Sequence, residues 1–185
     1  LDAVTGTANG ASSNVTLNTT GVVNVAEAVG TDIGVLTLTQ SGGATFADTV
    51  EATTVTLTDT TGTIAFQGNL TAGSLNTASQ DYNVSLTGSS NTITNDVSFV
   101  NTGSLTLGDA SGDSTTFAGG VDATTQSSIS AQGSVSTTNT ALDFGALTLA
   151  GDTSISGSGI TFSSTVSGDH LLTLTGGTST ITFAG

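Results

Sequence analysis

Residues 34–48 read GVLTLTQSGGATFAD, and residues 54–68 read TVTLTDTTGTIAFQG. The same module returns at residues 103–119 as GSLTLGDASGDSTTFAG and at residues 171–185 as LLTLTGGTSTITFAG. Each copy has a strand in which Leu or Val alternates with polar residues, then a polar turn, then a second strand that ends in Phe. Alternation with period two is typical of half-buried strands, and recurrence of such a unit indicates a repeat architecture. The module therefore predicts an all-β repeat fold.

The composition agrees with an ordered β-structure. Of the 185 residues, 35% are hydrophobic and 25 are Gly, and Pro is absent. Thr and Val favour strands, whereas Gly, Asn and Asp supply turns. The apolar residues alternate instead of scattering, which argues against disorder. Since no linker divides the chain, we expect a single β-repeat domain over residues 1–185, with residues 1–33 as degenerate first rungs.

Two architectures fit short alternating strands joined by polar turns: a β-sandwich and a parallel β-solenoid. The copies resemble each other in side-chain chemistry, as stacking of like residues in a solenoid requires. At ~20–25 residues per rung the chain makes about eight rungs, and a strand spacing of ~4.8 Å gives a rod near ~40 Å long. The repeat spacing is irregular, since Leu86 follows Leu57 at a much longer interval than Leu57 follows Leu38. We attribute the difference to turn insertions, and a β-sandwich fibre subunit is the alternative fold.

The alternation also predicts which side chains point inward. We expect the apolar residues of each copy to form ladders through the stack, with one ladder made of Phe. The predicted core residues are Leu36, Leu38, Phe46, Val55, Leu57, Ile64, Phe66, Leu105, Leu107, Phe117, Leu147, Leu149, Phe162, Leu172, Leu174, Ile181 and Phe183.

The segment 142–185 resembles the β-strand repeats of large bacterial exoproteins. The similarity lies in Leu147-Thr148-Leu149, in the Gly-Ser-Gly of residues 157–159, in Ile160-Thr161-Phe162 with Val166, and in Leu172–Thr175 with Ile181-Thr182-Phe183. Such repeats occur in filamentous-haemagglutinin-like adhesins and autotransporter passenger domains. The resemblance implies a right-handed parallel β-helix on a bacterial cell surface, used for adhesion or as a stalk.

The charge balance excludes several classes of function. The chain has no Lys or Arg and 14 acidic residues, which gives a formal charge of −14. Without cationic side chains it cannot neutralise phosphates, so we expect no binding to nucleic acid. Anionic membranes would repel the chain. It also has no apolar run of ~18 residues, so we expect no membrane insertion. The absence of Cys agrees with a secreted bacterial surface protein.

The expected partners follow from the repeat. The final copy ends at Gly185 with no polar cap, and an open solenoid end exposes unpaired strand edges. We therefore expect further repeats of a longer chain to follow, or another copy of the chain to associate head-to-tail or laterally. The predicted function is a non-enzymatic extracellular structural or adhesive rod. The alternative is a filament subunit joined head-to-tail by strand addition.

Acidic residues near turns are the candidate metal ligands. Asp109 and Asp113 flank one turn, and Asp48 lies close to Glu51. Ca²⁺ prefers carboxylate, amide and carbonyl oxygens, but no EF-hand spacing occurs here. Ca²⁺ is thus the one cofactor that we consider, and a calcium-binding surface-layer or matrix protein is a minor alternative function.

Two aromatic or basic residues are candidates for other chemistry. His170 is the only histidine and follows Asp169 at an expected turn. A catalytic triad needs a buried, oriented base, so we interpret His170 as a solvated turn residue and expect no catalytic site. Tyr82 is the one aromatic residue that we consider as an exposed platform for a sugar.

Outward-pointing Thr pairs suggest a further minor alternative, ice binding. The pairs are Thr37/Thr39, Thr56/Thr58 and Thr173/Thr175. Stacked on one flat face they would form a regular hydroxyl array. Outward Thr is also a common strand residue, so the pairs alone do not decide this function.

Overall fold

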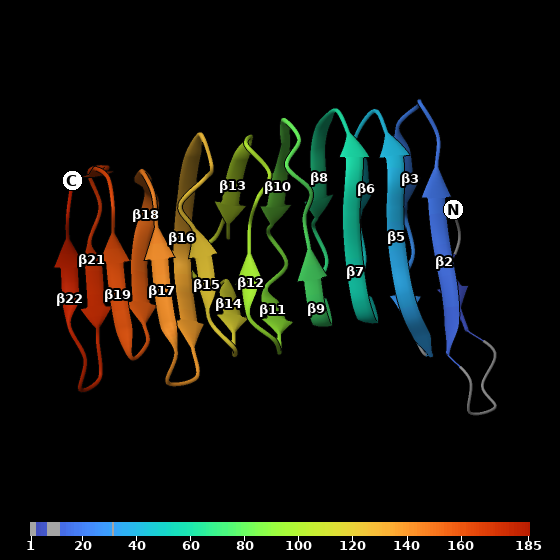
Figure 1. Cartoon of the computed structure of the whole chain (residues 1–185). Coiled ribbons are helices and arrows are strands. Elements are labelled where there is room, and N and C mark those ends of the chain that lie inside the picture. Colours follow the sequence, from blue (N-terminus) through green and yellow to red (C-terminus); the bar gives the residue numbers. More distant parts are fainter. Residues whose placement is uncertain (1–2, 7–11, 31) are drawn as a thin grey trace.

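The chain winds into a parallel β-solenoid of about eight turns. The computed structural model describes residues 3–6, 12–30 and 32–185, and among them it has strands but no helix. The predictions that fall on residues 1–2, 7–11 and 31 lie outside this range. As the chain passes from the N-terminus to the C-terminus, the nearer strands run up and the farther strands run down (Figure 1), so the coil is right-handed. The predicted all-β solenoid is confirmed, and the β-sandwich alternative is wrong.

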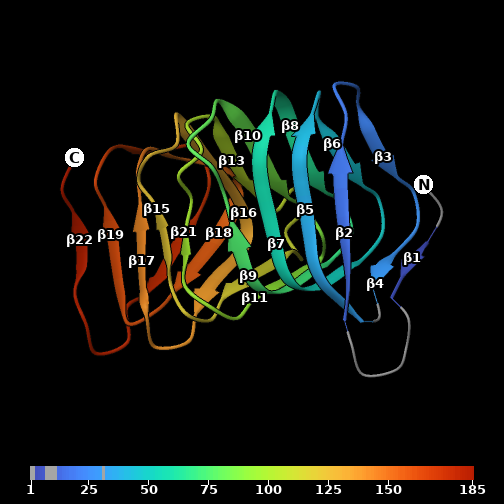
Figure 2. The ribbon, with the colours of Figure 1, turned by 45° about the vertical axis from the view of Figure 1, so that its right-hand side comes forward.

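Each turn passes through three faces, which are defined by their strands (Figure 2). Face 1 contains β1 (Val4–Thr5), β4 (Val29–Gly30), the start of β7 (Val50–Thr60) and of β9 (Leu70–Asn76), β11 (Ser90–Ile93), β14 (Ser114–Phe117), the end of β16 (Ser128–Thr137) and of β18 (Leu147–Ser156), and β21 (Leu172–Thr175). Face 2 contains β2 (Ser13–Asn18), β5 (Ile33–Ser41), the end of β7 and of β9, β12 (Val97–Ser98), β15 (Val121–Ala123), β17 (Ala141–Phe144), β19 (Gly159–Phe162) and β22 (Ile181–Phe183). Face 3 contains β3 (Val23–Val25), β6 (Ala44–Phe46), β8 (Gly62–Phe66), β10 (Tyr82–Leu86), β13 (Ser104–Leu107), the start of β16 and of β18, and β20 (Val166–Ser167).

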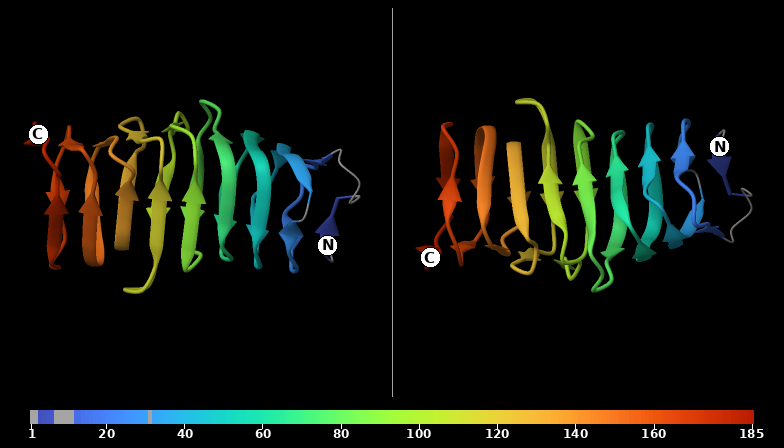
Figure 3. Two further views of the ribbon diagram at one scale, coloured as in Figure 1. Left: turned by 90° about the horizontal axis from the view of Figure 1, so that it is seen from below. Right: turned by 90° about the horizontal axis from the view of Figure 1, so that it is seen from above.

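The turns are more regular than the spacing of the module predicts. Among the paired residues of successive turns, Val4 and Val29 are the farthest apart in the sequence, and pairs such as Ile129 and Leu147 are the closest. The long interval between Leu57 and Leu86 does not come from a turn insertion, because the two residues do not occupy equivalent positions. Leu57 lies on face 2, whereas Leu86 lies on face 3, where it pairs with Phe66. The turns lie side by side along the rod in both views of Figure 3.

The module copies do not all lie above one another. The first two copies stack on faces 2 and 3, because Leu38 pairs with Leu57 and Phe46 pairs with Phe66. The third copy instead occupies faces 3 and 1, and the fourth occupies faces 1 and 2. The module is therefore a strand, a corner and a strand, which can be placed at any of the three corners.

This placement splits the single Phe ladder that we predicted. On face 3 the rings of Phe46 and Phe66 stack with centroids 4.9 Å apart. On face 2, Phe162 stacks between Phe144 and Phe183, with centroid distances of 6.0 and 4.9 Å. Phe117 belongs to face 1. The prediction of a single Phe ladder was wrong, because alternation fixes which side of a strand is buried but not which face of the solenoid the strand occupies.

The predicted core residues divide by their position along the rod. Those of the inner turns are buried: Leu36, Leu38, Phe46, Val55, Leu57, Ile64, Phe66, Leu105, Leu107, Phe117, Leu147, Leu149 and Phe162. Those of the last described turn differ from the prediction, because no strand of the structure covers them. Leu172 and Leu174 are partly buried, whereas Ile181 is 36% exposed and Phe183 is 58% exposed.

The segment 122–141, which has few apolar residues, is an ordinary turn of the coil. It is built from β15, β16 and β17, and its residues Ile129 and Val135 are buried in register with those of the neighbouring turns. Gln126 is also buried there. A turn poor in aliphatic residues is thus accommodated by turning a polar side chain inward.

We predict that Phe66→Ala destabilises the fold strongly. Phe66 is fully buried against Phe46, and removing a buried Phe side chain costs about 3–5 kcal/mol. Chemical denaturation followed by circular dichroism measures this change. Phe183→Ala is the matched control and should cost much less, because its ring is largely exposed. Equal losses from the two variants would contradict the burial described above.

Candidate functional site

Asp113 closes the turn between β13 and β14. Its carboxylate is buried, and Oδ2 accepts hydrogen bonds from the backbone N–H groups of Asp109 (2.8 Å) and Ala110 (2.9 Å). Asp109 itself is exposed. Desolvation and the neighbouring Asp113 carboxyl together raise the pKa of Asp109 above the usual range of a carboxyl group. The pair that we considered as metal ligands thus has one carboxylate already used to hold its own turn.

The second candidate pair lies on a different part of the surface. Asp48 Oδ1 accepts the backbone N–H of Thr49 at 2.6 Å, in the corner that leads to face 1. Glu51 is exposed on β7 and lines a shallow groove with Asp32 and Thr71. Within the described ranges, no three His, Asp or Glu residues gather closely enough to hold a metal ion. The four candidate ligands Asp48, Glu51, Asp109 and Asp113 therefore do not meet in one place.

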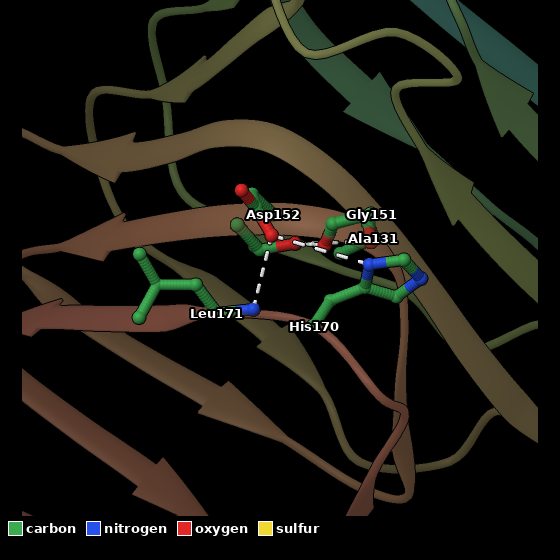
Figure 4. Close-up of polar contacts among 6 residues, drawn as sticks. Ala131, Gly151, Asp152, His170 and Leu171 are labelled. Atoms are coloured by element: carbon green, nitrogen blue, oxygen red, sulfur yellow. Dashed lines mark hydrogen bonds and ion pairs between the residues drawn. The ribbon is translucent and has the colours of Figure 1, made fainter.

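His170 lies in the turn before β21 and faces Asp152 of β18 (Figure 4). Its Nδ1 is 4.0 Å from Asp152 Oδ1, and both side chains are substantially exposed, at 43% and 70%. Asp152 Oδ1 also accepts the backbone N–H of Leu171 at 3.0 Å, which holds the turn against β18. The acidic side chain that lies against His170 thus comes from the neighbouring turn of the coil. An exposed pair of this kind lacks the buried, oriented base that nucleophilic catalysis requires.

Tyr82 is not an exposed platform, so this suggestion was wrong. Its side chain is 1% exposed, and its hydroxyl donates to the Leu57 carbonyl and accepts from the Ala78 N–H. Burial raises the pKa of the Tyr82 phenol. The residue anchors the inside of a corner.

The predicted Thr pairs do not form one array. Thr37 and Thr56 pair on face 2, whereas Thr173 and Thr175 lie on face 1. Face 1 has its own regular set of outward hydroxyl groups on the successive strands β11, β14, β16, β18 and β21. The set consists of Ser90, Thr92, Ser114, Thr116, Ser134, Ser136, Ser154, Ser156, Thr173 and Thr175. The parts of these strands that form face 1 carry no charged residue, unlike face 2, where Asp122 pairs with Asp143.

Sequence reasoning missed a group of buried polar side chains at the corner where face 2 passes into face 3. Ser41 and Thr60 pair through their hydroxyls and are each 3% exposed. Asn101 Nδ2 donates to the Tyr82 carbonyl at 3.0 Å, and Gln126 Nε2 donates to the Asn101 carbonyl at 2.9 Å. We call Ser41, Thr60, Tyr82, Asn101 and Gln126 the interior polar column. A polar residue reads as a turn residue in the sequence, so its burial was not predictable from the pattern.

Comparison with known proteins gave no match to a family model, a curated protein or a solved structure. In the part of the chain that the structure describes, no helix is long and apolar enough to span a membrane. The fold and the arrangement of side chains therefore carry the functional argument.

We predict that Asp113→Ala destabilises the turn between β13 and β14. The substitution leaves two backbone N–H groups without their acceptor, which costs about 1–3 kcal/mol. Thermal unfolding followed by circular dichroism measures the change. The control Asp169→Ala removes the same charge from an exposed turn and should have a small effect. Matching losses would show that charge, and not these two hydrogen bonds, accounts for the result.

Asp109→Asn should raise the melting temperature at neutral pH. Because the folded state raises the pKa of this carboxyl, its ionised form opposes folding above that pKa. Protonation removes the opposition, so the gain from the Asn variant should shrink as the pH falls through the carboxyl range. A series of melting curves between neutral and acidic pH tests the sign. A gain that persists unchanged in acid would contradict it.

Proposed function

We propose that this chain is a non-enzymatic structural segment of a bacterial cell surface, a stiff β-solenoid rod that acts as a stalk or an adhesive spacer. The observation that carries the proposal is the interior, where columns of in-register apolar side chains continue from turn to turn. The column Ala44–Ile64–Val84–Leu105–Ile129–Leu147 on face 3 illustrates this continuity. An interior filled in this way leaves length and stiffness as the main properties of the molecule.

The outer surface supports the same proposal. Its strands present mainly Ser, Thr and Asn, and the chain has a formal charge of −14 with no cationic side chain. Mutual repulsion of like charges keeps such rods soluble and apart. The charge-free hydroxyl set on face 1 supplies a repetitive polar surface for adhesion through many weak contacts.

A second candidate is a filament joined by strand addition. The last described turn presents the partly exposed apolar residues Ile181 and Phe183 beside the free edges of β20, β21 and β22. A strand edge of this kind is a template for another parallel layer. That layer can come from further repeats in the same chain or from a second copy, and only the second source makes a filament subunit.

Electron microscopy of the purified chain tests the proposed rod. We expect discrete rods about 40 Å long, since the turns are spaced by ~4.8 Å. Long uniform filaments would favour the strand-addition candidate instead. Compact particles without an elongated axis would contradict both.

The role as a spacer needs a test on a cell. A reporter epitope joined to the outer end of the rod on a bacterial surface should be more accessible to a large antibody than the same epitope without the rod. As a matched control, a rod with Phe66→Ala should lose this accessibility if the variant unfolds. Equal accessibility with and without the folded rod would overturn the stalk function.

A further inference from the structure

The interior polar column ends at two carbonyl oxygens that have no hydrogen-bond donor in the described part of the chain. They are Asn101 Oδ1 and Gln126 Oε1. Asn101 is 0% exposed and Gln126 is 6% exposed, so bulk solvent does not reach them. A buried carbonyl without a donor costs about 1–3 kcal/mol, and native proteins rarely leave one unsatisfied.

The neighbouring backbone fixes the orientation of both side-chain amides. Gln126 Nε2 donates to the Phe99 carbonyl at 2.8 Å and to the Asn101 carbonyl at 2.9 Å. Asn101 Nδ2 donates to the Tyr82 carbonyl at 3.0 Å. Rotating either amide by half a turn would place its oxygen against a carbonyl oxygen. The two unpartnered oxygens therefore follow from the surrounding hydrogen bonds and cannot be removed by exchanging O and N.

Another buried amide shows that this situation is not general in the fold. Asn91 Oδ1 accepts the Leu70 N–H at 3.0 Å, and its Nδ2 donates to the Gly88 carbonyl and to Thr115 Oγ1. Both ends of the Asn91 amide are thus satisfied by protein atoms. Among the residues that the structure describes, buried side-chain oxygens without a donor occur only at the corner occupied by Asn101 and Gln126.

The corner between faces 2 and 3 contains more connecting residues at Gln126 than it does on the next turn. Residues 124–127 separate β15 from β16, whereas only residues 145–146 separate β17 from β18 on the next turn. Because neighbouring turns are spaced by ~4.8 Å, one small molecule is able to bridge oxygens that face each other from two neighbouring turns. Gln126 already contacts the Asn101 backbone across that spacing.

We propose that a water molecule binds inside this corner and donates its two hydrogens to Asn101 Oδ1 and Gln126 Oε1. The chain has no Lys or Arg to act as a donor. A bound cation would find only neutral oxygens on these two side chains, and burying an unpaired charge costs far more than burying water. Water supplies two donors without charge, and internal waters typically serve buried polar groups in this way. The proposal goes beyond the rod function and does not depend on it.

A crystal structure of the wild-type chain, at a resolution that orders internal water, is the direct test. We expect density within hydrogen-bond distance of both oxygens. A dry corner, a protein donor at either oxygen, or an ion with contacts shorter than those of water would overturn the proposal.

Oxygen-17 relaxation dispersion, which detects long-lived internal water, tests the same site in solution. Asn101→Val should lose the signal of this water. Thr115→Val is the matched control, because it changes a buried polar residue on face 1 and should keep that signal. Retention of the signal in folded Asn101→Val would contradict the site, and if this variant fails to fold, the wild-type crystal structure still decides.

Discussion

The in-register stacking of parallel strands is the constraint on which the rest of the structure depends. Each turn must place an inward residue directly over the inward residue of the turn before, because the hydrogen-bond ladder fixes the register. Val55 lies on Leu36 and Leu75 on Val55 for this reason. Once the ladder is set, the apolar columns, the separate Phe stacks and the length of the rod all follow.

The corners absorb variation in the number of residues per turn. Successive turns use different numbers of residues, and the extra residues lie between faces. Where the backbone of one turn passes close to the next, the chain has a glycine. At Gly68, for example, an added Cβ would lie 2.2 Å from the Asp48 carbonyl carbon. Where the corner widens, polar side chains turn inward and form the interior polar column.

Several polar side chains of the described residues bind the backbone of the molecule itself. Asp113 holds a turn, Asp152 holds the segment that carries His170, and Tyr82 and Gln126 bind carbonyl groups inside the coil. These hydrogen bonds hold turns and corners of the coil in place. This use of side chains is what supports a scaffold as the proposed function.

The sequence by itself determined the strand character of the chain and the inward side of the strands, because an alternation with period two has the same meaning on every face. It favoured a solenoid over a β-sandwich, but only the register of the strands in the structure decided that they stack in parallel. The sequence did not determine the face of each strand, since the module copies at residues 34–48 and 103–119 look alike but occupy different corners. The burial of Tyr82, Asn101 and Gln126 was decided only by the tertiary structure, because their partners lie about one turn away along the chain. The same is true of the pairing of His170 with Asp152, which the coil brings together from neighbouring turns.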